Sequence, residues 1–406
     1  MTHGIMAVDF EERINYAKLR NERLIKVKEQ IKRHNIGALL CYDFDNIRYI
    51  TGTHIGEWAR NKMQRYVILP KNADPLLYDP AAPAKRKSAP WIADRTFPVV
   101  GSMRGSIPPE VGYVTTLAKS IKQVLVDYGI EKEPLGLDIV DIPFYQAIAK
   151  EGIEIVDGQQ VMLDAREIKT NDEIEVLKIA ASMVDAAYYN IAQNIKPGVK
   201  ENELVAIAND TLYRLGSELV ECVNSVSGPR AQPHPHTFGD RIIRPNDMIF
   251  LDIMHSFNGY RTCYYRTFVC GKPTNAQKEA YQKAWTWLKA SIDVIKPGVT
   301  TADVANSWPT AEEFGLKDER EAFLLQFGHG IGLSIWERPV ISRLFSFEHP
   351  FTIKEGMTFA LETYCPSADG QGAARIEEEV VVTKDGAERL FKFPVEELIS
   401  CGVPGV

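Results

Sequence analysis

The sequence predicts an α/β (α+β) protein in two parts: a smaller α/β domain, then a larger domain with internal pseudo-symmetry. Three observations support this class. Short apolar runs alternate with helical patterns over the first 160 residues, which is typical of a layered α/β fold. The segment Ile-Lys-Pro-Gly-Val occurs twice, at 195–199 and 295–299. A length of 406 residues suits two or three domains of roughly 150 residues.

The elements of the first part follow from apolar periodicity and local composition. Helices are predicted over 9–33 and 117–128. Strands are predicted over five short apolar runs: 37–42, 66–70, 75–78, 135–139 and 153–156. The composition changes near 161–169. We therefore expect one domain over 1–163 and a second over 164–406.

The second part contains the repeat and the helices around it. A helix over 171–194 is predicted, with Asn171 as its cap and acidic residues in its first turn. Each repeat follows an amphipathic helix and precedes a second one, which ends at a glycine, Gly216 or Gly315. A β-rich stretch then follows each copy, at 248–268 and 357–383. The shared order predicts a duplicated unit in one pseudo-symmetric domain.

Composition and charge exclude several classes of protein. Hydrophobic residues make up 45% of the chain and charged residues 25%, which is ordinary globular composition. The net charge of −7 argues against a general nucleic-acid or anionic-membrane partner. No apolar run approaches the ~20 residues of a membrane span, and the N-terminus has no signal-peptide core. Six scattered cysteines without a C-x-x-C pair suggest reduced thiols, so we expect a cytoplasmic protein.

Acidic residues interrupt the apolar strands of the second part. Asp252 lies in MIFLDIM, Glu362 in TFALETY, and Glu377 begins the run EEEVVVT. A carboxylate in such a strand loses solvation that only a cation, a proton or strong donors can offset. The alternative is that each faces solvent or pairs with an arginine. Because Asp252 and Glu362 hold equivalent points of the two repeats, we favour a functional role.

Histidines form the second unusual group. His329 lies in QFGHGIGL, between glycines that allow a backbone or a ligand to approach closely. His234 and His236 lie in a proline-rich loop, SGPRAQPHPHTF. Carboxylates with imidazole suit Mn, Fe, Co or Zn, whereas the alternative is histidines with ordinary packing roles. GHGIGL lacks the Lys-Ser/Thr ending of a phosphate-binding loop.

A predicted loop of the first part carries aromatic and cationic side chains. It reads HIGEWARNK and includes His54, Trp58 and Arg60. Arg60 could bind a substrate carboxylate through a bidentate pair. A solvated loop charge is the alternative.

Together these segments resemble the successive motifs of the "pita-bread" (M24) family of methionine and Xaa-Pro aminopeptidases, prolidases and creatinases. The resemblance rests on Asp252, NGYRTCYYRTFVCG, FGHGIGLSIWERP, Glu362 and RIEEEVVVT, and it covers about residues 165–390. Residues 1–160 resemble the creatinase-type N-terminal domain. The resemblance implies that domain followed by a pseudo-symmetric pita-bread domain. It also implies a homodimer with the N-terminal domain near the partner's active site.

The resemblance implies metal ligands at Asp252, His329, Glu362 and Glu377. The family's peptidases hold two metals and use a second Asp to bridge them. Cys263 replaces that Asp here, and a thiolate is a poor substitute between hard ions. We therefore expect one divalent metal (Fe, Zn or Mn) with Cys263 as a further candidate ligand. A metal-free site is the alternative.

The resemblance also suggests catalytic and substrate-binding roles. Either His234 or His236 would act as general acid/base, and Glu362 and Glu377 would share general-base work. Trp336 takes the place of a histidine that the peptidases use in proton transfer. The expected substrate-binding residues are His54, Trp58, Arg60, Tyr264, Tyr265 and Trp336.

The predicted function is an M24-like hydrolase that cleaves a C–N bond of a small, carboxylate-bearing substrate, non-peptide rather than peptide. Three alternatives stay open. The first is a metal-dependent Xaa-Pro dipeptidase or aminopeptidase. The second is a C–S lyase of the dimethylsulfoniopropionate lyase type, suggested by SGPR and RIIRPND, although Met254 stands where those lyases carry an extra Asp. The third is a non-catalytic binding protein, against which the retained ligand positions argue.

Overall fold

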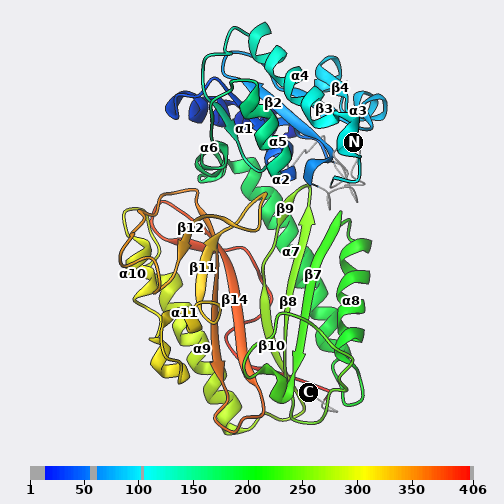
Figure 1. The fold of residues 1–406 in the computed structure, drawn as a ribbon. Coiled ribbons are helices and arrows are strands. Elements are labelled where there is room, and N and C mark those ends of the chain that lie inside the picture. The colour runs from blue at the N-terminus through cyan, green and yellow to red at the C-terminus, as the bar shows by residue number, and fades with distance from the viewer. Residues whose placement is uncertain (1–13, 55–61, 102–104, 403–406) are drawn as a thin grey trace, which may run out of the picture. The chain divides into compact units, whose positions relative to one another are not determined.

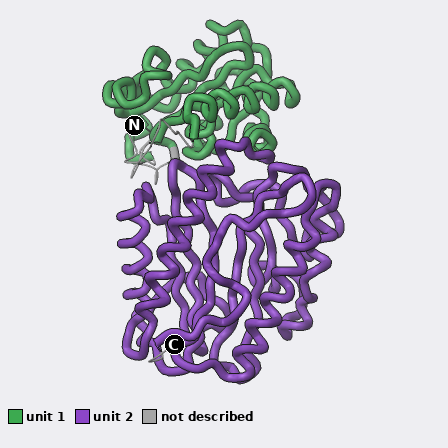
Figure 2. Tube along the Cα trace, turned by 180° about the vertical axis from the view of Figure 1, so that it is seen from behind, with its two compact units in different colours: residues 1–166 green, residues 167–406 purple. Residues whose placement is uncertain are grey.

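A computed structural model describes residues 14–54, 62–101 and 105–402. The chain divides into two compact units, Met1–Arg166 and Glu167–Val406 (Figure 2). Each unit mixes helices with strands (Figure 1). Among the described helices, none has the length and apolar character required to cross a membrane.

Unit 1 is built on one six-stranded sheet with the order β4-β3-β2-β1-β5-β6. The central strands β1, β2 and β3 are antiparallel neighbours, whereas β5 pairs with β1 and β6 with β5 in parallel. The strands are β1 Ala38–Cys41, β2 Tyr66–Pro70, β3 Leu76–Asp79, β4 Thr96–Pro98, β5 Leu135–Leu137 and β6 Ile155–Asp157. The helices are α1 Tyr16–Arg33, α2 Phe44–Thr51, α3 Ala82–Ser88, α4 Tyr113–Asp127, α5 Ile142–Lys150 and α6 Gly158–Arg166.

The predicted strands of unit 1 are all present within two residues. Each is a short apolar run, and β1, β2 and β5 are fully buried in the sheet. The first five residues of the predicted helix 9–33 lie outside the described residues. Helix α4 begins four residues before its predicted start, directly after Gly112, whose φ of +67° ends the preceding turn. Sequence reasoning missed α2 and α5, although each has a capping aspartate, Asp43 and Asp141.

Unit 2 contains two five-stranded sheets. The first has the order β16-β10-β8-β7, with β9 paired to β8, and the second has the order β12-β11-β13-β14-β15. Figure 1 shows the strands in the middle of the unit, with α8 at one side and α9 and α10 at the other. The helices are α7 Asn171–Asn194, α8 Glu201–Arg214, α9 Asn275–Val294, α10 Thr301–Ala305 and α11 Glu319–Ala322.

The strands of the first sheet are β7 Leu219–Ser227, β8 Met248–Phe257, β9 Tyr260–Arg261, β10 Tyr265–Cys270 and β16 Ile399–Cys401. Those of the second are β11 Phe327–Gly330, β12 Glu337–Ile341, β13 Thr358–Pro366, β14 Ala373–Val382 and β15 Ala387–Arg389. Both predicted β-rich stretches therefore form the central strands of a sheet.

The repeated Lys-Pro-Gly turns hold equivalent loops in the two halves of unit 2. Gly198 N donates to Ile243 O at 3.0 Å, and Gly298 N donates to Ile353 O at 2.9 Å. The two glycines have φ values of +97° and +95°, a region that favours glycine. The repeat thus marks a structural pseudo-symmetry, as the sequence predicts.

The helices next to the repeats differ from prediction in two details. The cap of α7 is Thr170 and not Asn171; Thr170 and Glu173 form a reciprocal capping box. In the second half, the predicted helix ending at Gly315 is broken into α10 and a 3-10 turn, Ala311–Phe314. Pro309 lies between them and cannot continue a helix. Gly315 still ends the turn, with a φ of +69°.

Alternation along the second sheet separates an apolar face from a polar one. Phe359 and Leu361 of β13 belong to the core cluster that also contains Ala284 and Leu288 of α9. Ala360 and Glu362, which alternate with these two residues, point to the opposite face. The sheet therefore presents Glu362 and its partner Glu377 on the side away from α9.

Candidate functional site

The acidic residues of the site lie on neighbouring strands. Glu362 of β13 is directly opposite Glu377 of β14. Glu379 lies on the same face as Glu377, because alternate residues of a strand share a face. Glu378 points to the other face, where the Arg266 guanidinium donates to it. Only part of the Glu-Glu-Glu run therefore reaches the site.

Three donor groups of unit 2 converge in a way that suits a metal ion. One ligand atom each from Cys263, His329 and Glu377 lie within 4.8 Å of one another, and all three residues are buried. His329 Nδ1 donates to Gly330 O at 2.9 Å, which leaves Nε2 as the acceptor. Neither this Nε2 nor either oxygen of Glu377 has a hydrogen-bond partner among the described residues. Buried polar atoms without partners are costly, so this donor set fits one divalent cation.

The other two predicted ligands, Asp252 and Glu362, are held by protein partners. Asp252 accepts from Asn224 Nδ2 at 3.1 Å and from Tyr264 N at 3.3 Å. Glu362 forms a buried ion pair with Arg375. The structure thus brings together three of the five predicted ligands, and the remaining two lie in the surrounding network.

Burial changes the charge state of the whole cluster. Desolvation raises the pKa of Asp252 to about 6 and the pKa of Glu362 to about 7. It also raises the pKa values of Glu377 and the Cys263 thiol well above their usual range, and neighbouring carboxylates add to both shifts. Burial lowers the pKa of His329 to about 4. The imidazole is therefore neutral at pH 7, and a bound cation would displace protons from the acids.

The glycines around His329 allow tight packing of strand β11. A Cβ on Gly328 would lie 2.6 Å from Leu361 Cδ2, and one on Gly330 would overlap the Arg338 carbonyl. Small residues are therefore required where β11 enters the sheet. This packing is the structural reason for the Gly-His-Gly pattern.

His234 and His236 lie beside the acidic cluster. The His234 ring stacks on Phe250 at 4.7 Å and contacts the Tyr265 ring at 5.5 Å. Both of its ring nitrogens are buried and have no partner among the residues that the structure describes. Burial lowers the pKa of His234 to about 2, so this imidazole is neutral. His236 is more exposed, and its ring lies 4.2 Å from that of His234.

The predicted aromatic residues separate into two groups. The Tyr265 hydroxyl hydrogen-bonds to Asp252, and Arg375 lies over its ring at 5.0 Å. The exposed Trp336 ring lies 4.5 Å from that of His329. Tyr264, in contrast, stacks on Phe391 in the core. Its ring does not line the site, because adjacent residues of an extended chain point to opposite faces.

Unit 1 contains the three other predicted substrate-binding residues, His54, Trp58 and Arg60. Trp58 and Arg60 lie outside the described residues. His54 lies within unit 1, where its ring is 3.2 Å from Arg48 Nη1 and its carbonyl accepts from Lys85.

Sequence reasoning missed two residues of the site, Arg375 and Glu379. Arg375 donates to Glu362 and also to the carbonyls of Leu324 and Leu325, at 2.6 and 2.5 Å. Glu379 accepts from Cys263 N at 2.7 Å. A signal was available, because both residues are an even number of positions from Glu377 and so share its face of a strand.

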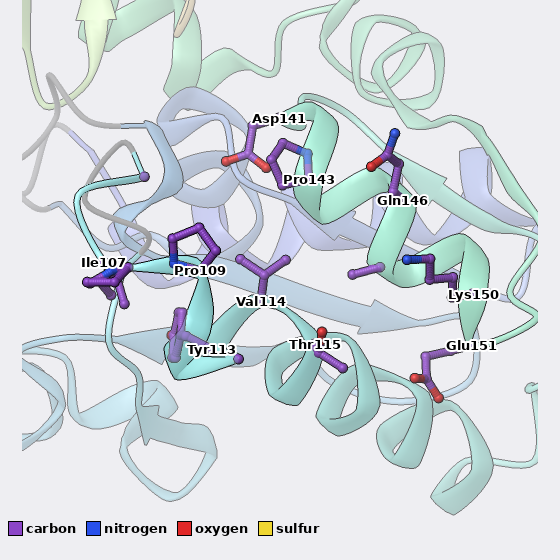
Figure 3. Close-up of a pocket in the computed structure, with 14 residues that line it drawn as sticks. Ile107, Pro109, Tyr113, Val114, Thr115, Asp141, Pro143, Gln146, Lys150 and Glu151 are labelled. Carbon is purple, nitrogen blue, oxygen red and sulfur yellow. The ribbon is translucent and has the colours of Figure 1, made fainter.

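A separate pocket of about 450 Å³ lies in unit 1, between α4, α5 and the loop before α4 (Figure 3). Val114 and Pro143 contribute to its apolar wall. Its aspartate, Asp141, caps α5 by accepting from Phe144 N at 3.0 Å. None of the predicted site residues that the structure describes lines this pocket.

The family model of metallopeptidase family M24 matches residues 175–384, which include every donor of the site. The chain belongs to metallopeptidase family M24. The creatinase/prolidase N-terminal domain matches residues 23–168. The predicted family and fold class, and the prediction of an M24-family enzyme, are thereby confirmed. A divalent metal is consistent with this metallopeptidase family.

Two curated relatives illustrate the range of the M24 family. A Xaa-Pro dipeptidase of Pyrococcus furiosus is 30% identical over 57% of this chain, and the match spans 65% of the relative, just under two thirds of its length. The dimethylsulfoniopropionate lyase DddP of Roseobacter denitrificans is 25% identical over 94% of this chain and 87% of its own length. Relatives of this M24 chain therefore include proteins named for two different reactions.

Solved structures agree on the fold of this M24 protein. The prolidase of Pyrococcus horikoshii has a TM-score of 0.75 at 24% identity, covering 93% of this chain and 100% of its own. Dipeptidase PepE of Mycobacterium ulcerans has a TM-score of 0.75 at 23% identity, covering 96% of this chain and 100% of its own. At this identity the likeness concerns the fold alone.

Proposed function

We propose that this M24 protein hydrolyses a C–N bond of a small, carboxylate-bearing, non-peptide substrate at a single-metal centre. The observation that supports it is the buried group of Cys263, His329 and Glu377. Within the described parts of the chain, His329 Nε2 and both Glu377 oxygens have no hydrogen-bond partner. These three residues would hold the cation. A divalent metal supplies polarisation of the scissile carbonyl or activation of a water molecule.

The residues around the three donors supply proton transfer and substrate binding. The pKa of Glu362 is about 7, which suits a group that takes up and returns a proton near neutral pH. Glu377 would share this work from its position opposite Glu362. His236, the more exposed of the two histidines, would exchange a proton with the leaving group, because the low pKa of His234 keeps its ring unprotonated. Trp336 would form a wall of the substrate pocket.

A second candidate is a metal-dependent Xaa-Pro dipeptidase, which is favoured by the name of the Pyrococcus furiosus relative. A third is a C–S lyase, favoured by the long match to DddP. Cys263 stands where the two-metal peptidases have a bridging Asp. This argues against a two-metal peptidase, because a thiolate is a poor bridging ligand for hard metal ions.

One substrate panel separates the three reactions. Purified protein would be incubated with Zn, Fe, Mn or Co and offered Xaa-Pro dipeptides, N-substituted amino acids and ureido or guanidino acids, and dimethylsulfoniopropionate. Release of an amine from the N-substituted amino acids or from the ureido or guanidino acids supports the proposal. Cleavage of dipeptides alone would replace it with a peptidase, and formation of an alkene with a thioether would replace it with a lyase. His329→Ala is the inactive control.

We also propose a cytoplasmic homodimer in which the N-terminal domain lies near the partner's active site. The family resemblance supports the dimer, and the scattered cysteines support the location. Light scattering coupled to size exclusion is the test. A particle of one chain mass, 45.6 kDa, would contradict the dimer.

A further inference from the structure

The segment that carries Cys263 lies between two strands and is not itself part of a strand. Strand β9 ends at Arg261 and β10 begins at Tyr265. Backbone N–H groups in such a segment need acceptors from elsewhere. Thr262 N donates to the His255 carbonyl at 3.1 Å, and Tyr264 N donates to the Asp252 carboxylate. The conformation of Cys263 is therefore set by side chains of the site as well as by backbone.

Glu379 provides the acceptor for Cys263 itself. Its Oε1 accepts from Cys263 N at 2.7 Å, and the residue is fully buried. Its Oε2 has no hydrogen-bond partner within the described parts of the chain. Glu379 also lies on the same face of β14 as Glu377, two residues away. One face of β14 thus carries Glu377, which belongs to the metal-binding group, and Glu379, which holds the backbone of the second donor, Cys263.

Small neighbours leave room for this arrangement. Glu379 is opposite Ala360 in the sheet, and Ala360 is opposite His329. Cys263 packs against Ala360 and Ile331. The carboxylate of Glu379, the Cys263 backbone and the His329 ring are therefore arranged around one alanine. Glu379 is not within the 4.8 Å group of donor atoms, so its contact is with the backbone that carries the thiol.

We propose that Glu379 is a positioning residue that fixes Cys263 where its thiolate can bind a metal ion. This inference rests on the proposed metal centre. Groups that orient the ligands of a metal typically contribute about 10–100-fold to its affinity.

The test uses Co²⁺ alone as the probe and the full chain as the protein. A thiolate bound to Co²⁺ gives a charge-transfer absorption in the near ultraviolet, which reports the Cys263–metal bond without any assay of activity. The variants are Glu379→Leu, which removes the acceptor, and Glu379→Gln, which keeps an oxygen for Cys263 N. Cys263→Ser identifies the band, and His329→Ala identifies the site. Val380→Ala is the matched control, since it weakens the same strand on its opposite, apolar face.

Glu379→Leu is expected to lose or shift the band and to weaken Co²⁺ binding by about tenfold or more. Glu379→Gln is expected to restore the band and most of the affinity, and Val380→Ala to keep both. A band that is unchanged in Glu379→Leu would overturn the inference, as would equal losses in Glu379→Leu and Val380→Ala. If wild type itself gives no band that depends on Cys263, the proposed metal centre is wrong. This outcome differs from an unchanged band in Glu379→Leu, which contradicts only the role of Glu379.

Discussion

Glu362 and Glu377 lie directly opposite each other on β13 and β14, but among the described residues only Glu362 forms an ion pair, with the guanidinium of Arg375. The two carboxylates therefore have different chemistry. Glu362 is held in a fixed ion pair, whereas Glu377 is free to bind a cation. This asymmetry divides the predicted ligand set into metal donors and supporting acids.

Removing Arg375 should destabilise unit 2 strongly. Arg375→Gln would leave Glu362 without a counter-charge and release the carbonyls of Leu324 and Leu325. Breaking a buried pair costs about 3–5 kcal/mol, so we expect a loss of about 3 kcal/mol or more in the free energy of unfolding, measured in urea. Arg389→Gln, at a more exposed arginine, should cost less than about 1 kcal/mol. Equal costs would contradict the role of Arg375.

Restoring an acid at position 263 should change the metal stoichiometry. Cys263→Asp supplies the hard oxygen donor that a bridged pair of Mn²⁺ ions requires. We expect bound Mn to rise from about one to about two equivalents per chain, measured by elemental analysis after dialysis. Cys222→Ser, at a cysteine outside the donor group, is the control. If the stoichiometry does not change, then Cys263 is not the only residue that prevents this site from binding two metal ions.

Adding a methyl group at Gly330 should disrupt the site through packing. In Gly330→Ala the new Cβ would overlap the Arg338 carbonyl, so β11 and β12 must separate. We expect a loss of more than about 2 kcal/mol in unfolding free energy together with loss of metal binding. Gly386→Ala should be nearly neutral, because the nearest atom to its Cβ would be 4.0 Å away. A soluble Gly330→Ala protein that binds metal normally would contradict the packing argument.

His255 should contribute a loss of stability as the pH drops below 6.5, because it is buried in its neutral form. Its ring nitrogens contact Ser217 Oγ and the Ala180 carbonyl, each at 3.0 Å, and burial lowers its pKa from 6.5 to about 4. Between these values the unfolded chain binds a proton that the folded protein does not, so protons favour unfolding. From pH 7 to pH 5 this difference amounts to about 2 kcal/mol.

The check for His255 is the pH dependence of urea unfolding in wild type and two variants. His255→Gln removes the titrating group, so its unfolding free energy relative to that of wild type should rise by about 2 kcal/mol between pH 7 and pH 5. His349→Gln, at an exposed histidine, should retain the wild-type dependence. Parallel curves for all three proteins would refute the role of His255.

Much of the fold could be predicted because its signals are local. Apolar runs located the strands, and the repeated turn located the pseudo-symmetry. The donors Cys263, His329 and Glu377 were also among the predicted ligands. The pairing of Glu362 with Arg375 could not be predicted, because it depends on how two strands align, and that alignment is a property of the folded sheet.

The position of the Tyr264 ring against Phe391 could have been anticipated from the sequence. Neighbouring residues of extended chain point in opposite directions, so one of the Tyr264 and Tyr265 rings had to enter the core. The same rule would have separated Glu378 from Glu377 and Glu379. The alternation of side chains along a strand thus identifies residues of the site, such as Glu379, that motif matching does not.

The matching turns at Gly198 and Gly298 have a consequence for how the two halves of unit 2 divide their labour. Each half uses the same scaffold of hydrogen bonds to support its central strands. The first half then contributes Asp252 and Cys263, while the second contributes His329, Glu362 and Glu377. The two halves therefore share the same supporting structure but contribute different residues to the site.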